Sequence, residues 1–394
     1  MTHKLFLDKI FKTPDDNKFE IAELKGKGHP DTLSDALASR ISIDYAKWWM
    51  NELGVGVEQV PHHNFDKILL AGGEVNIKWG GGEVIKPFNT ILAGNATIKQ
   101  GNIEIPLKQI VSLSASALFR KSIGMKVEWD LDISNVSTSS QALSNTYSQG
   151  LFANDTSFGT GHYPLTKLEQ TMYDVNIELE KIMQNKKFLG TDVKIMGRRI
   201  NDEYVFTLAA GIKDESVNSE KDYFNHLSYI QEKILNKLPE PSRLSINQND
   251  TPKKGTNEEN YYLLVTGSSV ENADHGQVGR GNRVTGMITP FRPQTIEAIA
   301  GKNLTRHVGG FYNIWAQQIS KKIWERTGVG SQVVIVSEIG KPIQDCYIGV
   351  SSKQEVNKEI ANETCNKVIK GYNDYLNDLM INGGGKHYPF NYVT

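Results

Sequence analysis

Glycines and basic side chains alternate between residues 266 and 310, a pattern typical of a site for a highly charged anion. The glycines are Gly276, Gly279, Gly281, Gly286 and Gly301. The basic residues are Arg280, Arg283, Arg292, Lys302 and Arg306. Glycine lets a backbone approach a ligand closely, and arginine and lysine supply donors for phosphate oxygens. The stretch therefore predicts a polyphosphate site, and the alternative is a solvated glycine-rich surface loop.

This stretch matches neither of the common phosphate-binding loops. The order GxxxxGK followed by Ser or Thr is absent, and no GxGxxG follows a predicted strand. The pattern therefore indicates phosphate binding without indicating a kinase-type or dinucleotide-type loop.

A second cluster, GKGHPDT, places His29 and Asp31 on either side of Pro30, just ahead of a predicted helix. Oxygen ligands suit magnesium, and a helix N-terminus attracts anions, so Asp31 could organise a metal and a phosphate together. The alternative is that Asp31 and Thr32 only cap the helix.

Three weaker clusters follow along the chain. Adjacent residues on an extended chain point to opposite faces, so the pair His62 and His63 argues against a shared zinc ion. Asp66 and Lys67 are either site residues or an ion pair. Asp155 lies in the turn NDTSFGTG, where it could bind a ligand or form an Asx turn.

Asp192 and Lys194 alternate in the segment TDVKIMG, with the apolar Val193 between them. On a strand this spacing places both charges on one face. They are candidates for the same site, and a paired charge at a strand edge is the alternative.

The elements that must position these residues alternate between helical and extended patterns. Helices are predicted near residues 33–53, 166–183, 219–238, 311–326 and 355–380, and strands near 68–71, 75–79, 192–200, 204–210, 243–249, 261–266 and 332–338. Pairs of Ser or Thr with an acidic residue three positions later (32/35, 166/169 and 219/222) mark the starts of three helices. A helix followed by paired strands recurs about three times, and the antiparallel-looking pairs argue against a doubly wound parallel sheet. The predicted class is α+β.

Composition limits the function classes. The chain has 394 residues, a formal net charge of −1, 39% hydrophobic and 23% charged residues, which is typical of a globular protein of two or three compact units. A net charge near zero argues against a nucleic-acid partner. No segment resembles a signal peptide or a membrane span, and Cys346 and Cys365 are the only cysteines, so we expect a cytoplasmic protein without a membrane partner.

Ten motifs, in order along nearly the whole chain, resemble those of the S-adenosylmethionine synthetase (methionine adenosyltransferase) family, and specifically its archaeal-type branch. They are GKGHPDTLSDALA, HHNFDKILLAGG, GGGEVIKP, ANDTSFGTGHYPLTKLE, DVKIMGRR, YLLVTGSS, GQVGRGNRVTGMITPFRP, AGKN, HVGGFYN and SEIGKPI. The region from GRGNR to GKN is the most specific of these.

The resemblance implies synthesis of S-adenosylmethionine from ATP and methionine. In this family the methionine sulfur attacks C5′ of ATP, and the tripolyphosphate leaves and is then hydrolysed to phosphate and diphosphate. A neutral thioether needs no general base, so no Ser-His-Asp or Cys-His constellation is expected. The resemblance also implies Mg²⁺, two ions per site, and leaves K⁺ open as a further ion.

Roles carry over residue by residue. His29, Lys194, Arg280 and Lys302 match residues that contact the tripolyphosphate, and Asp31 matches a magnesium ligand. Asp155 matches the aspartate that binds the methionine ammonium group. The remaining substrate-binding candidates are Asp192, Asp274, Arg283 and Arg306.

The chain departs from the bacterial and eukaryotic branch at several positions. Thr32 and Gly281 stand where that branch has basic residues, and Arg283 is expected to compensate for the second. Arg306 replaces a lysine, and Val308 falls where the second magnesium aspartate would be, so the second metal ligand is unassigned. The stretch 134–149 lacks the acidic motif of the archaeal pattern, which leaves its part in the site open.

The resemblance implies one catalytic unit over residues 1–394, made of three similar, interwoven α+β subdomains with mixed or antiparallel sheets around a pseudo-threefold axis. It implies homodimers whose active sites lie at the interface and which in some members pair again as tetramers. Two other functions are weighed against the active transferase. One is a non-catalytic regulatory relative, and the other is a generic ATPase or kinase that uses the glycine-rich basic stretch.

Overall fold

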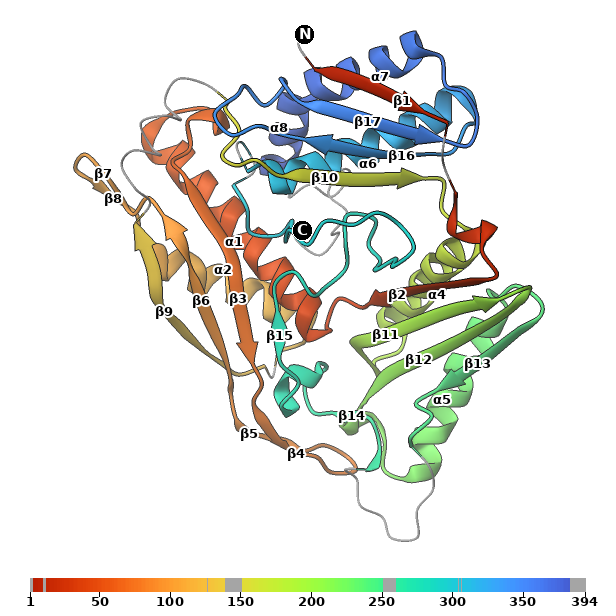
Figure 1. The fold of residues 1–394 in the computed structure, drawn as a ribbon. Coiled ribbons are helices and arrows are strands. Elements are labelled where there is room, and N and C mark those ends of the chain that lie inside the picture. Colours follow the sequence, from red (N-terminus) through yellow and green to blue (C-terminus); the bar gives the residue numbers. More distant parts are fainter. Residues whose placement is uncertain are drawn as a thin grey trace.

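The computed structural model describes residues 3–9, 12–125, 127–138, 151–250, 260–303, 305 and 307–382. Three large sheets surround a central segment of irregular chain (Figure 1). Sheet A consists of β1 (Lys4–Asp8), β17 (Tyr347–Ser352), β16 (Ser331–Val336) and β10 (Phe158–Tyr163). Sheet B consists of β13 (Ser242–Ile246), β12 (Glu203–Lys213), β11 (Leu189–Ile200) and β2 (Phe19–Lys25), with β14 (Leu263–Leu264) also paired to β12. Sheet C consists of β15 (Gly276–Gln277), β3 (His63–Ala71), β6 (Phe88–Ala96) and β9 (Trp129–Thr138).

The three sheets share one pattern of pairing. Each has a central antiparallel pair, β16 with β17, β11 with β12, and β3 with β6. The first strand of each pair has an antiparallel outer neighbour, β10, β2 or β15. The second has a parallel outer neighbour, β1, β13 or β9. This repetition confirms the predicted α+β class with three similar units.

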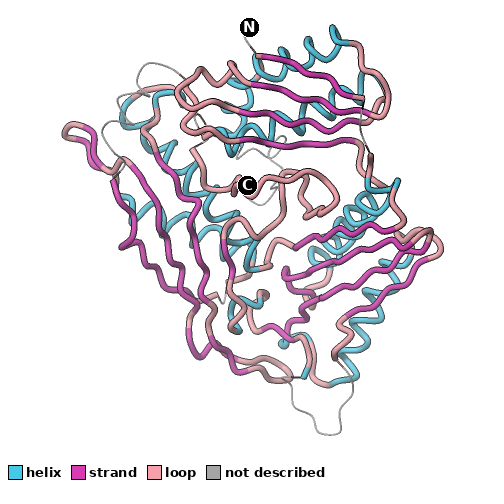
Figure 2. Tube along the Cα trace, in the orientation of Figure 1, coloured by secondary structure: helices cyan, strands magenta, loops and turns pink. Residues whose placement is uncertain are grey.

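Helices cover one face of each sheet (Figure 2). In sheet A, α6 (Val308–Thr327) packs on β10 and β16 and α7 (Lys358–Lys370) packs on α6. In sheet B, α4 (Lys167–Asn185) packs on β11 and β2 and α5 (Glu220–Leu235) packs on α4 and β13. In sheet C, α1 (Pro30–Leu53) packs on β3 and β15 and α2 (Leu107–Ser122) packs on α1. Two small hairpins, β4 (Glu74–Asn76) with β5 (Glu83–Lys86) and β7 (Lys99–Gln100) with β8 (Ile103–Glu104), extend from sheet C.

The units are interwoven because an edge strand of each sheet comes from a distant segment. β2 directly precedes α1, a helix of sheet C, but it pairs in sheet B. β10 precedes α4 of sheet B but pairs in sheet A, and β15 precedes α6 of sheet A but pairs in sheet C. This cyclic exchange places β15 and the segment that follows it near the centre of the molecule (Figure 1).

The predicted helix starts have mixed outcomes. The Thr166 side chain accepts a hydrogen bond from the Glu169 backbone N–H, and the Glu169 carboxylate accepts one of 2.8 Å from the Thr166 backbone N–H. The capping box of α4 is therefore confirmed. Ser219 caps α5 as expected. The Thr32/Asp35 start of α1 is wrong, because His29 is the N-cap and Pro30 is the first helical residue. Proline fits that position since its fixed φ is helical and its missing N–H would have no partner there.

The C-terminal helical stretch is also different from the prediction. One helix was expected over 355–380, but the chain forms α7 and α8 (Tyr372–Asn382), which are separated at Gly371. Glycine is a weak helix former and commonly marks such a boundary.

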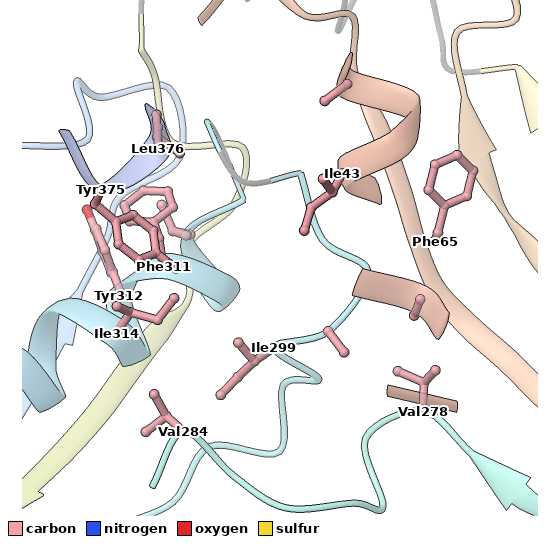
Figure 3. Close-up of a cluster of buried hydrophobic side chains, with 14 of the residues drawn as sticks. Ile43, Phe65, Val278, Val284, Ile299, Phe311, Tyr312, Ile314, Tyr375 and Leu376 are labelled. Atoms are coloured by element: carbon pink, nitrogen blue, oxygen red, sulfur yellow. The ribbon is translucent and has the colours of Figure 1, made fainter. Parts of the chain in front are cut away.

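The central segment is held by apolar packing. Val278, Val284 and Ile299 are buried in one cluster with Ile43 of α1, Phe65 of β3 and Phe311 of α6 (Figure 3). Their burial contradicts the alternative of a solvated surface loop for residues 278–300. The glycine-rich basic stretch therefore has a defined position between sheets A and C.

Candidate functional site

A cavity of about 500 Å³ lies where the ends of β2 and β11 meet the start of α1 and the segment before β15. This volume falls within the range of small-ligand sites. Its lining is mostly polar and includes six of the predicted site residues. These are His29, Asp31, Asp192, Lys194, Asp274 and Arg280. The other lining residues are Lys25, Ala209, Tyr262, Ala273 and His275.

His29 reaches the cavity because it caps α1. Its Nδ1 accepts a 3.2 Å hydrogen bond from the backbone N–H of Asp31. Burial, together with the charge of Lys25, lowers the pKa of His29 to about 4. The ring is therefore neutral near pH 7, and the bond to Nδ1 leaves Nε2 as the protonated nitrogen. Nε2 is a hydrogen-bond donor.

Asp31 is buried in the first turn of α1, and both of its oxygens are engaged. Oδ1 accepts from the backbone N–H of Gln277 at 3.0 Å, and Oδ2 accepts from Lys25 Nζ at 2.8 Å. Lys25 Nζ also donates to the carbonyl oxygen of Arg280 at 2.5 Å. Asp31 and Lys25 thus tie α1, β15 and β2 to the glycine-rich stretch.

Asp192 supports the far wall of the cavity. It is buried, and its Oδ2 accepts from Ser269 N at 2.8 Å and from Ser269 Oγ at 2.5 Å. Burial raises the pKa of Asp192 to about 7. Ser269 Oγ lies 2.9 Å from Asp274 Oδ2, so one serine positions both carboxyl groups. The predicted common face of Asp192 and Lys194 is confirmed, because both line the cavity while Val193 is fully buried.

The phosphate-binding candidates Lys194 and Arg280 differ from these anchored acids. Lys194 is half-exposed, and its nearest carboxylate is Glu23, with Nζ and Oε2 3.5 Å apart. Arg280 is exposed at the cavity rim. Both cationic groups are therefore accessible to an anion in the cavity.

Gly281 follows Arg280 where the bacterial branch has a basic residue. A Cβ at this position would lie 2.1 Å from Asp35 Oδ2. Asp35 is buried and accepts from Gly279 N at 2.9 Å, so it holds the glycine-rich stretch against α1. A larger residue at position 281 would therefore force the buried Asp35 carboxyl group to move.

Lys302 belongs to a different region, which lies between β3 and the segment before α6. Its ammonium group is buried between Asp66 Oδ2 at 2.7 Å and Glu297 Oε2 at 2.9 Å. Asp66 is also paired with Lys67. Burial alone would raise the pKa of Asp66, but Lys302 holds it below its ordinary value. Asp66 and Lys67 therefore form an ion pair, and Lys302 completes it.

The other predicted residues that the structure describes also lie outside the main cavity. Asp155 is exposed just before β10, and its Oδ1 accepts from the N–H of the next residue, Thr156, at 2.7 Å, whereas an Asx turn would use the N–H two residues on. Ser157 Oγ in the same segment donates to Glu297 Oε1 at 3.1 Å. Arg283 lines a second, smaller cavity with Thr160, His162 and Glu297. Arg306 and most of 134–149 lie outside the described residues.

His62 and His63 are both buried. His63 is buried, its Nε2 lies 2.7 Å from Ser42 Oγ, and burial lowers its pKa to about 3. Among the described residues, no group of three or more His, Cys, Asp or Glu side chains is arranged to hold a metal ion.

The comparisons with known proteins give one result. The family model for S-adenosylmethionine synthetase (AdoMet synthetase) matches residues 7–381. The chain belongs to this family. It is thus a member of an enzyme family, as the ten motifs indicate.

Curated members of the S-adenosylmethionine synthetase family match over most of their length. An S-adenosylmethionine synthase of Thermoplasma acidophilum is 36% identical, with 88% of each chain covered. One from Pyrobaculum aerophilum is 34% identical, covering 96% of this chain and 98% of that relative. A probable S-adenosylmethionine synthase of Aquifex aeolicus is 34% identical, covering 91% and 94%.

A solved structure supports the fold. An unusual S-adenosylmethionine synthetase from Campylobacter jejuni superposes with a TM-score of 0.60 at 16% identity, over 95% of this chain and 97% of that one. The likeness at this identity concerns the fold alone. Within the described part of the chain, no helix has the length and apolar character needed to cross a bilayer.

Sequence reasoning missed Lys25, which lines the cavity beside Asp31. It stands four residues before His29 and alternates with Glu23, so both side chains lie on one face of β2. The signal was this alternation of charge at the end of a strand, directly before the GHPD motif.

Proposed function

We propose that this chain synthesises S-adenosylmethionine from ATP and methionine, and that the Asp31 cavity binds the polyphosphate. The observation that carries the proposal is the convergence of Lys25, Lys194 and Arg280 with a neutral His29 in one cavity. The leaving tripolyphosphate carries about four negative charges, so preorganised cations there lower the barrier. Family membership supports the same activity.

In this proposal the methionine sulfur attacks C5′ of ATP, the C5′–O bond breaks, and tripolyphosphate leaves with the bonding electrons. Water then cleaves the tripolyphosphate to phosphate and diphosphate. Lys194 and Arg280 bind the phosphate oxygens, and His29 donates from Nε2 near the breaking bond. Asp155 binds the methionine ammonium group, a role that its exposed carboxylate allows.

The donor set of the cavity fits Mg²⁺. Asp31 and Asp274 are oxygen ligands, and magnesium is commonly bound by one or two carboxylates together with substrate phosphates and water. When bound, such ions would neutralise the charge that develops on the leaving group. We propose two Mg²⁺ per site and leave K⁺ as a further ion to be tested.

The cavity lined by Asp31, Lys25, Lys194 and Arg280 is called the Asp31 cavity, and the segments around Asp155 and Lys302, which meet at Glu297, are called the Asp155–Lys302 region. We further propose a homodimer in which each site combines the Asp31 cavity of one copy with the Asp155–Lys302 region of the other. Asp155 and Lys302 do not line the cavity of about 500 Å³ that holds Asp31. The cavity opens on the helix-free face of sheet B, where Phe19 and Ile200 are exposed as cross-strand neighbours. Sheet A exposes Phe158 and Val336 in the same way. Apolar side chains on uncovered sheet faces favour packing against a second copy.

The test is to incubate the purified chain with ATP, methionine and MgCl₂ and to quantify S-adenosylmethionine, phosphate and diphosphate. We expect all three in equal amounts, with activity dependent on the metal. A folded protein that forms no sulfonium product would instead be a regulatory relative. Phosphate release that does not require methionine would indicate an ATPase.

A further inference from the structure

Lys25 is a buried lysine with an unusual set of partners. Among the described residues its Nζ makes two hydrogen bonds, to Asp31 Oδ2 and to the carbonyl oxygen of Arg280. The nearest further carboxylate is Glu23, whose Oε1 lies 3.6 Å away, beyond hydrogen-bond distance. One of the three N–H donors of the ammonium group therefore remains for another acceptor.

Lys25 also lies directly opposite Lys194 in the pairing of β2 with β11. Directly opposite residues of an antiparallel pair project from the same face, and like charges in this arrangement destabilise a sheet. The single carboxylate between them, Glu23, approaches each ammonium group only to about 3.5 Å. Lys25 is neutralised by Asp31, whereas Lys194 has only the more distant Glu23 among the described residues, so release of Lys25 from Asp31 would leave two cations side by side on the cavity wall, which favours a multiply charged anion.

The partner of Lys25 is the carboxylate that a metal ion would need. Asp31 Oδ1 is bonded to the backbone of Gln277, so Oδ2 is the oxygen shared between Lys25 and any cation that enters the cavity. A Mg²⁺ ion at Oδ2 would displace the ammonium group from it. The released lysine would then be next to Lys194 with donors directed into the cavity.

We propose that Lys25 is a further phosphate-contacting residue, which occupies Asp31 in the empty site and transfers to the polyphosphate when a divalent cation binds Asp31. This inference rests on the proposed function of the cavity. A purely structural role is the alternative, because Asn282 already clamps the backbone of Lys25, with bonds of 3.0 Å to its N–H and 2.7 Å to its carbonyl. The two roles differ in what happens when the charge is removed.

The probe is a nitrogen-bridged tripolyphosphate analogue that resists hydrolysis, titrated in MgCl₂ into the full chain by calorimetry. Lys25→Gln retains an N–H donor for Asp31 and Arg280 but removes the charge, and Lys25→Met removes both. Lys194→Met is the positive control. Lys27→Met is the matched negative control, because Lys27 lies outside the cavity lining and pairs with Glu180 at 3.2 Å.

We expect Lys25→Gln and Lys25→Met to raise the Kd of the analogue by about tenfold or more, since a charge-assisted contact is lost. Lys27→Met should bind as the wild type does. A second measurement uses Mn²⁺ alone, followed by electron paramagnetic resonance. Lys25→Gln should bind Mn²⁺ more tightly, because the competing ammonium group is absent.

Unchanged analogue binding by a folded Lys25→Gln protein, with Lys194→Met impaired, would overturn the role of Lys25 and leave the proposed function standing. If the wild type does not bind the analogue, or if Lys194→Met binds it normally, the proposed function of the cavity and the role of Lys25 both fail. If Lys25→Met does not fold, the decision rests on Lys25→Gln and on the Mn²⁺ titration.

Discussion

Lys194 and Lys302, the two lysines predicted to contact phosphate, have opposite surroundings in the two regions that hold the predicted site residues. Lys194 in the Asp31 cavity has a side chain that is 42% exposed, and its nearest carboxylate is 3.5 Å away. Lys302 in the Asp155–Lys302 region is 3% exposed and is bonded to two carboxylates at 2.7 and 2.9 Å. The first lysine is ready to bind an anion, whereas the second is neutralised by the protein. Lys194 and Lys302, which the family motifs both match to phosphate-contacting residues, therefore differ in how far their charges are neutralised within the single chain.

The largest expected effect is on the Asp31 cavity. Asp31→Asn should reduce S-adenosylmethionine formation by about 100-fold or more, because a charged ligand for the metal and the partner of Lys25 is lost. The measurement is the initial rate over a MgCl₂ titration, with product quantified by chromatography. Asp202→Asn, in the exposed turn between β11 and β12, is the control and should be unaffected. An unchanged magnesium dependence in Asp31→Asn would remove Asp31 from the metal site.

The second expected effect is a difference between the two regions in how much a lysine substitution lowers the free energy of unfolding. Lys302→Met should lower the free energy of unfolding by about 3 kcal/mol, because it removes the buried cation that buried Asp66 shares with the partly exposed Glu297, and among the described residues Asp66 keeps only the exposed Lys67. Lys194→Met should change it by less than about 1 kcal/mol, since exposed ion pairs contribute little. Urea denaturation at pH 7 measures both. Equal losses of stability in the two variants would refute the contrast between a closed and an open region.

A third effect concerns the methionine side of the site. Asp155→Asn should raise the KM for methionine by about tenfold, because a charge-assisted bond to the ammonium group is weakened. The KM for ATP should stay within about twofold, since Asp155 lies outside the Asp31 cavity. Steady-state kinetics with each substrate varied in turn provide the test. A rise confined to the KM for ATP would exclude the methionine role.

The smallest effect is on the pH dependence of stability. Burial raises the pKa of Asp35 to about 7 from 3.8, so the folded chain holds this proton more tightly than the unfolded chain. The stability that this group contributes is present below pH 3.8 and is lost as the pH rises through about 7. The wild type should therefore lose about 1 kcal/mol or more relative to Asp35→Asn between pH 5 and pH 8.

The contribution of Asp66 to stability depends on pH in the opposite direction, because Lys302 lowers the pKa of Asp66 below its ordinary value. Its contribution is present above pH 3.8 and is lost only as the pH falls below that value. The difference in urea midpoint between Asp35→Asn and the wild type should therefore change from pH 5 to pH 8. The corresponding difference for Asp66→Asn should stay the same. A constant difference for Asp35→Asn would show that Asp35 is ionised throughout.

Local signals in the sequence were sufficient for several elements. The capping box at Thr166, the N-cap at Ser219 and the alternation of Asp192 with Lys194 depend on neighbouring residues, and all three are confirmed. The edge strands β2, β10 and β15 were not predicted. Each pairs with a sheet formed by distant segments, and local periodicity contains no record of that pairing.

The composition of the candidate site could be predicted better than its division into two regions. Six of the predicted residues line one cavity, but sequence order does not reveal that Lys302 and Arg283 are outside it. Lys25 was missed because a lysine between a strand and a glycine resembles an ordinary surface residue. Only the fold shows that it is buried against Asp31 and opposite Lys194.

The proposal that the two regions form one transferase site across two copies can be tested with mixed dimers. Asp31→Asn and Asp155→Asn chains are co-refolded, and S-adenosylmethionine formation is measured at low methionine, with mixed dimers verified by native mass spectrometry. Half of the dimers are mixed and one of their two sites has both aspartates intact, so we predict about a quarter of wild-type activity. Activity no higher than that of either variant alone, with mixed dimers present, would contradict the shared site.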